Sequence, residues 1–401
     1  MFSNFAREVW VHARHLVLLS TVPALVWAGC VEDTGGGTGG TAGSGGTGGS
    51  GGSLPDATLV VTADWLNQSL TLLDYDKLVD GQSDAEEAIL GTIDLSDWEP
   101  GPLELEITPD GETAVVSVGP GFFDGSGLTN MIIGAPDVPP GGTLLIVDLA
   151  TGQAESIATE DVPMGIAISP DGTRAYTANY GTTDARGDSL SIIDLVTRQV
   201  IEEVQVGSGP EQVVLSPDGS LGAINVAGAD GVRIFQTADV AGTLTEIVPT
   251  GNDPSDIAFL GGNTRIIVTN SQGFNVTLID TSDPSAPSPI QNFATQGGVP
   301  YGVTYVPGRN IVLAAMSPLA AGLPANFVTI DIDGDVLTPS LPDALPGGSF
   351  PLTVGVDALG DFAFVAHVSD QEFSIIDLDT GDIRAISWLG PFGPTYVAVQ
   401  R

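Results

Sequence analysis

Seven prolines divide most of this chain into segments of similar length, and each proline opens an alternating run of apolar and polar residues. Successive prolines lie 43 to 61 residues apart, and the longest interval contains an inserted loop at about 119–141. A repeat of this length is one small unit that cannot bury its apolar face alone and must pack against neighbouring copies. The prolines are Pro102, Pro163, Pro210, Pro254, Pro300, Pro351 and Pro394.

Within one unit, four short runs alternate in hydrophobicity, as half-buried β-strands do. In the clearest copy the first run ends at Ser169-Pro170-Asp171-Gly172, where Asp and Gly supply the backbone conformations of a tight turn. The second run covers 174–179, the third covers 190–195, and the fourth, at 200–206, is more variable. Four antiparallel strands in each of seven units predict an all-β fold, a seven-bladed β-propeller of four-stranded antiparallel blades over 54–401.

The phase of the repeat predicts how the ring closes. The body begins with a run of the second type at 58–63 and ends with a run of the first type at 395–400. We therefore expect the C-terminal strand to join the N-terminal blade as its innermost strand, followed by strands near 58–63, 69–74 and 88–93. This closure would remove the unpaired strand edges that an open array exposes.

Two second-type runs carry a recognisable motif. Tyr176-Thr177-Ala178-Asn179 and Ile267-Val268-Thr269-Asn270 resemble the YVTN-type β-propeller repeats of bacterial surface and periplasmic proteins. The resemblance extends over about 55–401. It implies a seven-bladed propeller but no single activity, since related propellers include lactonase-like and quinoprotein-like folds and function depends on sites added to a fold.

The N-terminus has the pattern of an export signal. The apolar run 16–29 has 14 residues and is interrupted by Pro23, which is too short for a membrane-spanning helix. It ends in Trp27-Ala28-Gly29-Cys30, which resembles the lipobox of bacterial lipoproteins, although Trp27 stands where that family usually has Leu. We therefore expect a lipoprotein signal peptide at 1–29 and a lipidated Cys30, with simple secretion as the alternative.

The segment after Cys30 should tether the folded body to a membrane. Residues 34–53 contain almost only Gly, Thr and Ser, a composition typical of a flexible linker, so 30–53 is interpreted as lipidated cysteine plus tether. Val31 follows the cysteine, where Asp would be expected to retain the lipoprotein in the inner membrane. The expected location is the cell envelope, on the outer membrane.

Composition excludes several classes of function. The chain has 50 Asp and Glu against 11 Lys and Arg, a formal net charge of −39, and such a surface repels nucleic acid. The single cysteine rules out an intrachain disulfide or a zinc–thiolate cluster. Of the three histidines only His367 lies in the expected propeller, so catalysis by a histidine base has one candidate there.

Candidate ligand-binding residues lie on one face of the expected ring. We call this the upper face; it carries the loops between second and third strands and the connections between blades. Aromatic rings beside carboxylates could stack a sugar or hold a cation; alternatively these rings pack across the closure or under the insertion. The candidates are Trp65, Trp98, Trp388, Phe122, Phe123, His367 and Asp64, with Asp97 and Glu99 nearby.

A second candidate site follows from the position two residues after each proline, which should lie near the mouth of the central channel. Glu104 and Asp256 occupy it in two units, and together with Glu106 they could supply oxygen ligands to Ca²⁺. Propeller channels also commonly hold only water, so this reading stays open.

Three functions are compatible with these patterns. The favoured one is a monomeric, non-catalytic envelope lipoprotein whose propeller binds a small molecule, glycan or protein through the upper face. The second is an enzyme, for instance lactonase-like, that uses carboxylates or a channel-bound cation. The third is an envelope scaffold with protein partners alone.

Overall fold

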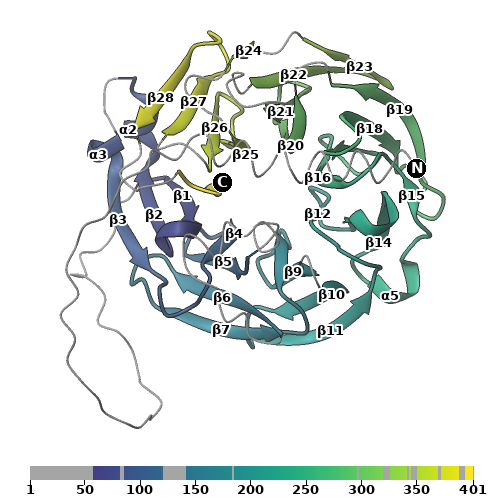
Figure 1. Ribbon diagram of the computed structural model, residues 1–401, viewed down its shortest axis with the longest axis horizontal. Coiled ribbons are helices and arrows are strands. Elements are labelled where there is room, and N and C mark those ends of the chain that lie inside the picture. The colour runs from purple at the N-terminus through teal and green to yellow at the C-terminus, as the bar shows by residue number, and fades with distance from the viewer. Residues whose placement is uncertain are drawn as a thin grey trace, which may run out of the picture.

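Seven antiparallel sheets stand like blades around a common axis (Figure 1). The computed structural model describes residues 57–81, 85–120, 141–182, 185–295, 298–318, 326–340, 343–344, 350–368, 372–387 and 393–400. Six sheets have four strands each, and the sixth blade adds a short fifth strand. The predicted seven-bladed β-propeller is therefore confirmed.

The first three blades take their strands as follows, from the axis outward. Blade 1 contains β29 (Tyr396–Val399), β1 (Leu59–Asp64), β2 (Ser69–Asp74) and β3 (Ile89–Asp94). Blade 2 contains β4 (Pro102–Ile107), β5 (Thr113–Val118), β6 (Gly142–Asp148) and β7 (Ala154–Thr159). Blade 3 contains β8 (Pro163–Ile168), β9 (Arg174–Gly181), β10 (Arg186–Asp194) and β11 (Gln199–Gln205).

The remaining blades repeat this order. Blade 4 contains β12 (Val213–Leu215), β13 (Leu221–Val226), β14 (Gly231–Gln236) and β15 (Val248–Pro249). Blade 5 contains β16 (Pro254–Phe259), β17 (Arg265–Asn270), β18 (Asn275–Asp280) and β19 (Ser288–Ala294). Blade 6 contains β20 (Val299–Val306), β21 (Ile311–Ser317), β22 (Asn326–Asp333), β23 (Val336–Pro339) and β24 (Asp343–Ala344). Blade 7 contains β25 (Pro351–Val356), β26 (Phe362–His367), β27 (Glu372–Asp377) and β28 (Ile383–Ser387).

Among the described residues, helical structure is confined to short connections. The α-helical turns are α2 (Tyr75–Val79), α3 (Ala85–Ala88) and α5 (Val240–Thr243), and η1 (Trp65–Asn67) and η3 (Ala227–Ala229) are 3₁₀ turns. Within the described part of the chain, no helix is long and apolar enough to cross a membrane.

The C-terminal strand closes the ring as predicted. β29 lies beside β1 near the axis (Figure 1), with Tyr396 opposite Ala63 and Val399 opposite Val60. The Gln400 side chain extends the closure, because its Oε1 accepts a hydrogen bond from the Leu59 amide at 2.9 Å. The chain ends therefore complete one sheet, and blade 1 has no free inner edge.

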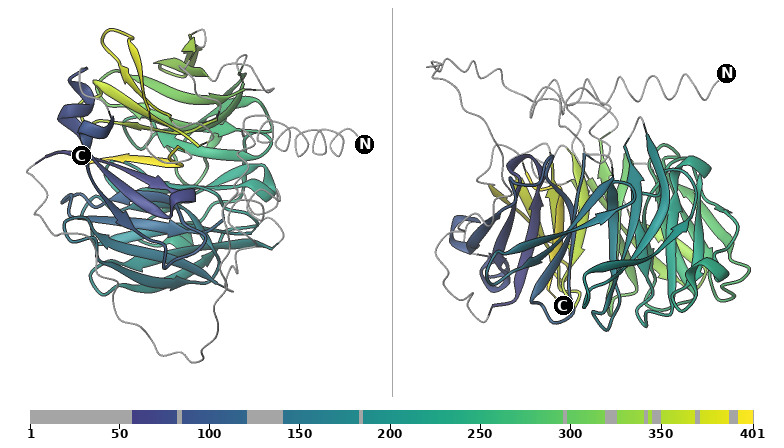
Figure 2. Two further views of the ribbon diagram at one scale, coloured as in Figure 1. Left: turned by 60° about the vertical axis from the view of Figure 1, so that its left-hand side comes forward. Right: turned by 90° about the horizontal axis from the view of Figure 1, so that it is seen from below.

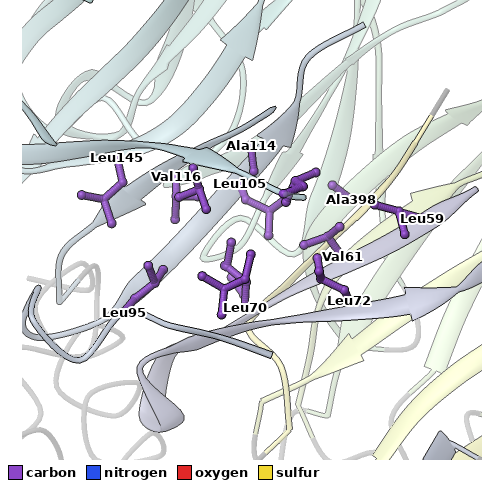
Figure 3. Packing of buried hydrophobic residues seen from close by; sticks show 14 of the residues in the cluster. Leu59, Val61, Leu70, Leu72, Leu95, Leu105, Ala114, Val116, Leu145 and Ala398 are labelled. Carbon is purple, nitrogen blue, oxygen red and sulfur yellow. The ribbon is translucent and has the colours of Figure 1, made fainter. Parts of the chain in front are cut away.

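Each pair of neighbouring blades encloses its own apolar cluster. Successive side chains of a strand point to opposite faces, so Val61 packs toward blade 2 and Val60 packs toward blade 7. Figure 3 shows the cluster between blades 1 and 2, which includes Leu105 and Leu145 of blade 2 and Ala398 of the closing strand. Burial on both faces explains the nearly continuous apolar runs of the inner strands.

The lower face carries the tight turns between first and second strands and the turns between third and fourth strands, and Figure 2 shows the disc edge-on. In the Ser169–Gly172 turn, Gly172 has a φ of 68°, which an L side chain rarely adopts. The Asp171 carboxylate accepts hydrogen bonds from the Thr173 amide at 3.0 Å and the Ser169 hydroxyl at 2.6 Å. These bonds lower the pKa of Asp171 to about 2. The PDG motif thus has a structural role.

Candidate binding site at the upper face

A backbone irregularity recurs at the upper end of the inner strands. In five blades the inner strand carries one extra residue just after its proline. In blades 2, 3 and 6, the two residues that follow the proline lie opposite one residue of the second strand. In blades 5 and 7, one residue after the proline has no partner on the second strand. In blade 2, for example, Leu103 and Glu104 lie between the paired residues Pro102 and Leu105. A β-bulge of this kind turns side chains out of the regular alternation, so the residues after the prolines can point away from the blade interfaces.

The bulges bring apolar side chains from several blades together. The residue directly after the proline is apolar in four blades, and all four belong to one cluster that is distinct from the seven between blades. We call this the upper cluster. It contains Trp65, Leu103, Met164, Tyr180, Val299, Tyr301, Leu352 and Val368, with Leu66, Phe274 and Phe350 packed against them.

Polar side chains lie close together at the second position after the proline of the inner strands. The Gln212 Nε2 amide of blade 4 donates to Glu104 Oε2 of blade 2 at 3.2 Å. Gly165 stands between them in blade 3, and a Cβ there would lie 2.3 Å from Gln212 Oε1. Because Gly165 has no Cβ, it leaves room for this contact between residues that stand two after the prolines of blades 2 and 4.

Asp256 occupies the same position, two residues after the proline, in blade 5. Its Oδ2 accepts a hydrogen bond from the Val303 amide of blade 6 at 2.7 Å, and its Oδ1 accepts one from the Ile257 amide at 2.7 Å. Both carboxylate oxygens are thus occupied by backbone donors of two blades. We call Glu104, Gln212 and Asp256 the axial cluster.

Burial raises the pKa of both carboxyl groups of the axial cluster. Loss of solvent raises the pKa of Glu104 well above its usual range, and the negative charge of Asp256 raises it further. Burial also raises the pKa of Asp256 to about 7, against the effect of its two amide donors. The negative charge of Glu106 contributes to both shifts. Burial therefore favours the neutral form of both carboxyl groups.

The expected Ca²⁺ site receives no support from the part of the chain that the structure describes. There, no three or more His, Cys, Asp or Glu side chains are arranged to hold a metal ion. Ca²⁺ takes six to eight oxygen ligands, whereas the oxygens of Asp256 already accept backbone hydrogen bonds.

Asp64 and His367, two of the predicted ligand-binding residues, are buried at equivalent positions of blades 1 and 7. Asp64 accepts hydrogen bonds from the hydroxyls of Thr62 at 3.0 Å and Thr71 at 2.5 Å. His367 has no exposed surface, and its Nε2 lies 2.8 Å from Ser374 Oγ. Burial lowers the pKa of His367 to about 4, so the imidazole is neutral and enclosed by protein.

The predicted tryptophans lie in two different environments. Trp65 is 2% exposed in the upper cluster, and its Nε1 donates to the Gly119 carbonyl at 2.9 Å. Trp98 is partly buried and packs against the cluster between blades 1 and 2. The structure therefore does not join these two rings in one patch. Trp388, Phe122, Phe123 and Cys30 lie outside the described residues.

Sequence reasoning missed the upper cluster itself. Its signal was the apolar residue directly after the proline, as in Leu103, Met164, Tyr301 and Leu352. Simple alternation assigns these residues to the sides of a blade, and only the bulge redirects them.

No protein-family model matches the sequence, and no curated protein matches it. Solved structures resemble it in fold. A putative 6-phosphogluconolactonase from Bacteroides uniformis has a TM-score of 0.65 at 14% identity, over 86% of this chain and 100% of that chain. The periplasmic gluconolactonase of Pseudomonas aeruginosa has a TM-score of 0.63 at 17% identity, over 86% and 99%.

A third neighbour has a different chemistry. Hydrazine synthase from Kuenenia stuttgartiensis has a TM-score of 0.60 at 17% identity and covers 75% of this chain and 90% of that chain. At such identities the similarities establish the β-propeller fold and no activity. The YVTN-type repeat stays a prediction.

Proposed function

We propose that this chain is a non-catalytic binding protein whose propeller takes a small ligand at the upper face. The observation that carries the proposal is the repeated bulge, which directs apolar side chains of four blades into one cluster above the axial cluster. Ligand sites commonly combine an apolar lining with a few convergent polar groups. The lower face, by contrast, carries the same Pro-Asp-Gly turn in blades 2, 3 and 4.

The state of His367 supports a binding function over histidine-based catalysis. A general base must reach the reacting proton and titrate near the working pH. His367 is buried, it is bonded to Ser374, and its pKa is lowered to about 4. It is the one histidine among the described residues.

Two leucines of blade 7 provide a matched test of the proposal. Leu352 belongs to the upper cluster and is 7% exposed, whereas Leu359 lies in the lower turn and is 74% exposed. Compounds that raise the Tm of the full chain would be retested on Leu352→Ala and Leu359→Ala. We expect the first variant to weaken ligand binding and the second to leave it unchanged.

Truncation of a buried leucine costs about 2–5 kcal/mol, so Leu352→Met, which conserves volume, serves as a second variant with a preserved fold. Equal ligand affinity in the Leu352 variants and the wild type would show that the ligand does not bind here.

A lactonase-like hydrolase is the second candidate, and the axial carboxyl groups favour it. A carboxyl group with a raised pKa can act as a general acid near neutral pH, and Glu104 and Asp256 both meet this condition. Hydrolysis of gluconolactone by the wild type, with loss of the rate in Glu104→Gln, would support this candidate. A rate equal to the uncatalysed background would exclude gluconolactone as a substrate.

We also propose that the propeller is exported and held on the outer membrane by a lipid on Cys30. The support is the apolar run 16–29, the lipobox-like residues before Cys30 and the Gly-rich segment 34–53. Incorporation of labelled palmitate should be lost in Cys30→Ser, and the variant should leave the membrane fraction. Labelling that persists in this variant would contradict the anchor.

A further inference from the structure

One cation stands at the upper face of this acidic molecule without an ionic partner. Arg186 begins β10, in the loop region between the second and third strands of blade 3. In the parts of the chain that the structure describes, its side chain makes neither a hydrogen bond nor an ion pair. This is unexpected in a chain with 50 Asp and Glu against 11 Lys and Arg.

Two other described arginines form ion pairs with carboxylates, which Arg186 does not. Arg198 pairs with Glu155, and Arg309 pairs with Asp361 at 3.3 Å and Asp379 at 2.6 Å. Both pairs lie on the lower side, at turns between strands. The upper loops and blade connections that the structure describes contain no Arg or Lys besides Arg186.

The Arg186 side chain is held in place by two nonionic contacts. Its Cζ lies 5.4 Å from the centroid of the Tyr180 ring, which places the guanidinium over an aromatic face. On the blade 4 side it lies over Gly209, where a Cβ would stand 2.7 Å from Nη1. Gly209, with a φ of 68°, therefore leaves the space that the guanidinium occupies.

These contacts direct the cation toward the upper cluster. Tyr180 is a member of that cluster, and Gly209 directly precedes Pro210 and the inner strand of blade 4. Stacking uses the faces of the guanidinium and leaves its N–H edges free to donate. The planar fork of these donors matches a carboxylate in bidentate geometry.

Two described carboxylates, Asp161 and Asp188, form no ion pair with Arg186. Burial raises the pKa of Asp161, and the charge of Asp188 raises it further. The Gln205 amide, in its hydrogen-bonding orientation, donates to Asp188 at 2.8 Å. The Arg186 guanidinium therefore lies over the Tyr180 ring and not in an ion pair with either aspartate.

We propose that Arg186 anchors the carboxylate group of a small organic acid whose apolar part contacts the upper cluster. This inference rests on the proposed binding function and names its ligand class. The negative field of the whole molecule opposes an anion at long range, but at physiological ionic strength it is screened beyond about 8 Å. The direct guanidinium–carboxylate contact persists at short range.

Three probes of similar size and different charge test the inference on the full chain. They are benzoate, benzyl alcohol and benzylamine, and binding is measured by titration calorimetry. We expect benzoate to bind most tightly. Arg186→Gln should weaken it about tenfold, the loss of roughly one charge-assisted contact. Arg186→Lys should weaken it less, because the charge remains while the fork is lost.

Arg198→Gln is the matched control, because it removes the same charge from the lower side and should leave benzoate affinity unchanged. Circular dichroism melts show whether each variant is folded. Equal benzoate affinity in Arg186→Gln and the wild type would overturn the inference. Tighter binding of benzylamine, with loss in Leu352→Ala, would also overturn it but would leave the proposed function standing. Failure of all three probes to saturate overturns the inference, and the wider ligand screen then tests the proposed function alone.

Discussion

Asp64 and His367 occupy the same position of the repeat. The sequence suggested a ligand-binding role for both, whereas the structure gives each of them a hydrogen bond within its own blade. In blades 3 and 5 the equivalent position holds Asn179 and Asn270, whose amides donate to hydroxyls of the third strand. Asp64 and His367 make the corresponding contacts, to Thr71 and Ser374. The position ties the second strand to the third. An ionisable side chain there makes stability depend on pH.

Replacing Asp64 with Asn should stabilise the fold at alkaline pH. Burial raises the pKa of Asp64 to about 7, so its contribution to stability is complete below about pH 4 and is lost as the pH rises through about 7. The Asn variant does not titrate. We expect its Tm to exceed that of the wild type by about 2 °C or more at pH 8, and by less near pH 4. A Tm difference that does not change with pH would contradict this account.

His367→Asn should change the acid side of the stability profile. Burial lowers the pKa of His367 to about 4, so its contribution is complete above about pH 6.5 and is lost as the pH falls through about 4. The Asn amide can bond to Ser374 as Asn179 bonds to Ser191. We expect the Tm of the variant to fall less than that of the wild type between pH 6.5 and 4. Parallel Tm curves would mean that this imidazole is not the group that titrates.

At the scale of the element, the inner strand carries both the scaffold and the candidate site. Its upper end bulges. Backbone carbonyls at the bulge accept hydrogen bonds from side chains on the second strand of the neighbouring blade. Ser117 donates to the Met164 carbonyl at 2.8 Å, and Thr269 donates to the Tyr301 carbonyl at 2.6 Å. The bulges that direct side chains to the upper cluster are therefore fixed by bonds between blades.

Gly165→Ala should be strongly destabilising, since a Cβ there would lie 2.6 Å from both the Glu211 carbonyl oxygen and Gln212 Cα. Backbone atoms cannot yield easily, so we expect a loss of about 3 kcal/mol or more in the free energy of unfolding. Gly91→Ala is the control, because nothing lies within 4 Å of the added Cβ. Denaturant unfolding measures both variants, and similar losses would show that blades 3 and 4 are not packed this closely.

At the scale of the whole molecule, the strands and the closure were predictable and the site was predictable only in part. Alternation and tight turns are local, so they specify each blade, and the phase of the repeat places β29 in blade 1. The axial residues Glu104 and Asp256 followed from the same phase. The upper cluster did not, because a bulge shifts the register by one residue, and composition does not reveal the shift. Burial of His367 was not predicted for another reason. His367 occupies the position that holds a buried Asn in blades 3 and 5, and the equivalence of these positions was not predicted from the sequence.

Deletion of 391–401 should abolish cooperative folding. It removes β29 and leaves the inner edge of β1 unpaired, and it takes Val397 and Ala398 from the clusters on both sides of blade 1. Deletion of 1–53 is the control and should leave a cooperative melt, since the described strands begin at Leu59. A melt of the C-terminal deletion like that of the parent would be incompatible with the closure.

The central claim is that ligands bind at the upper face while the lower face only holds the blades. Hydrogen–deuterium exchange of the full chain, with and without the tightest-binding of the three benzene-ring probes, tests this most directly. The account predicts slower exchange at 102–106, 164–166, 299–303 and 351–353, and unchanged exchange in the lower turns at 109–111, 170–172, 217–219 and 357–360. Protection of the lower turns without protection of the upper segments would contradict it.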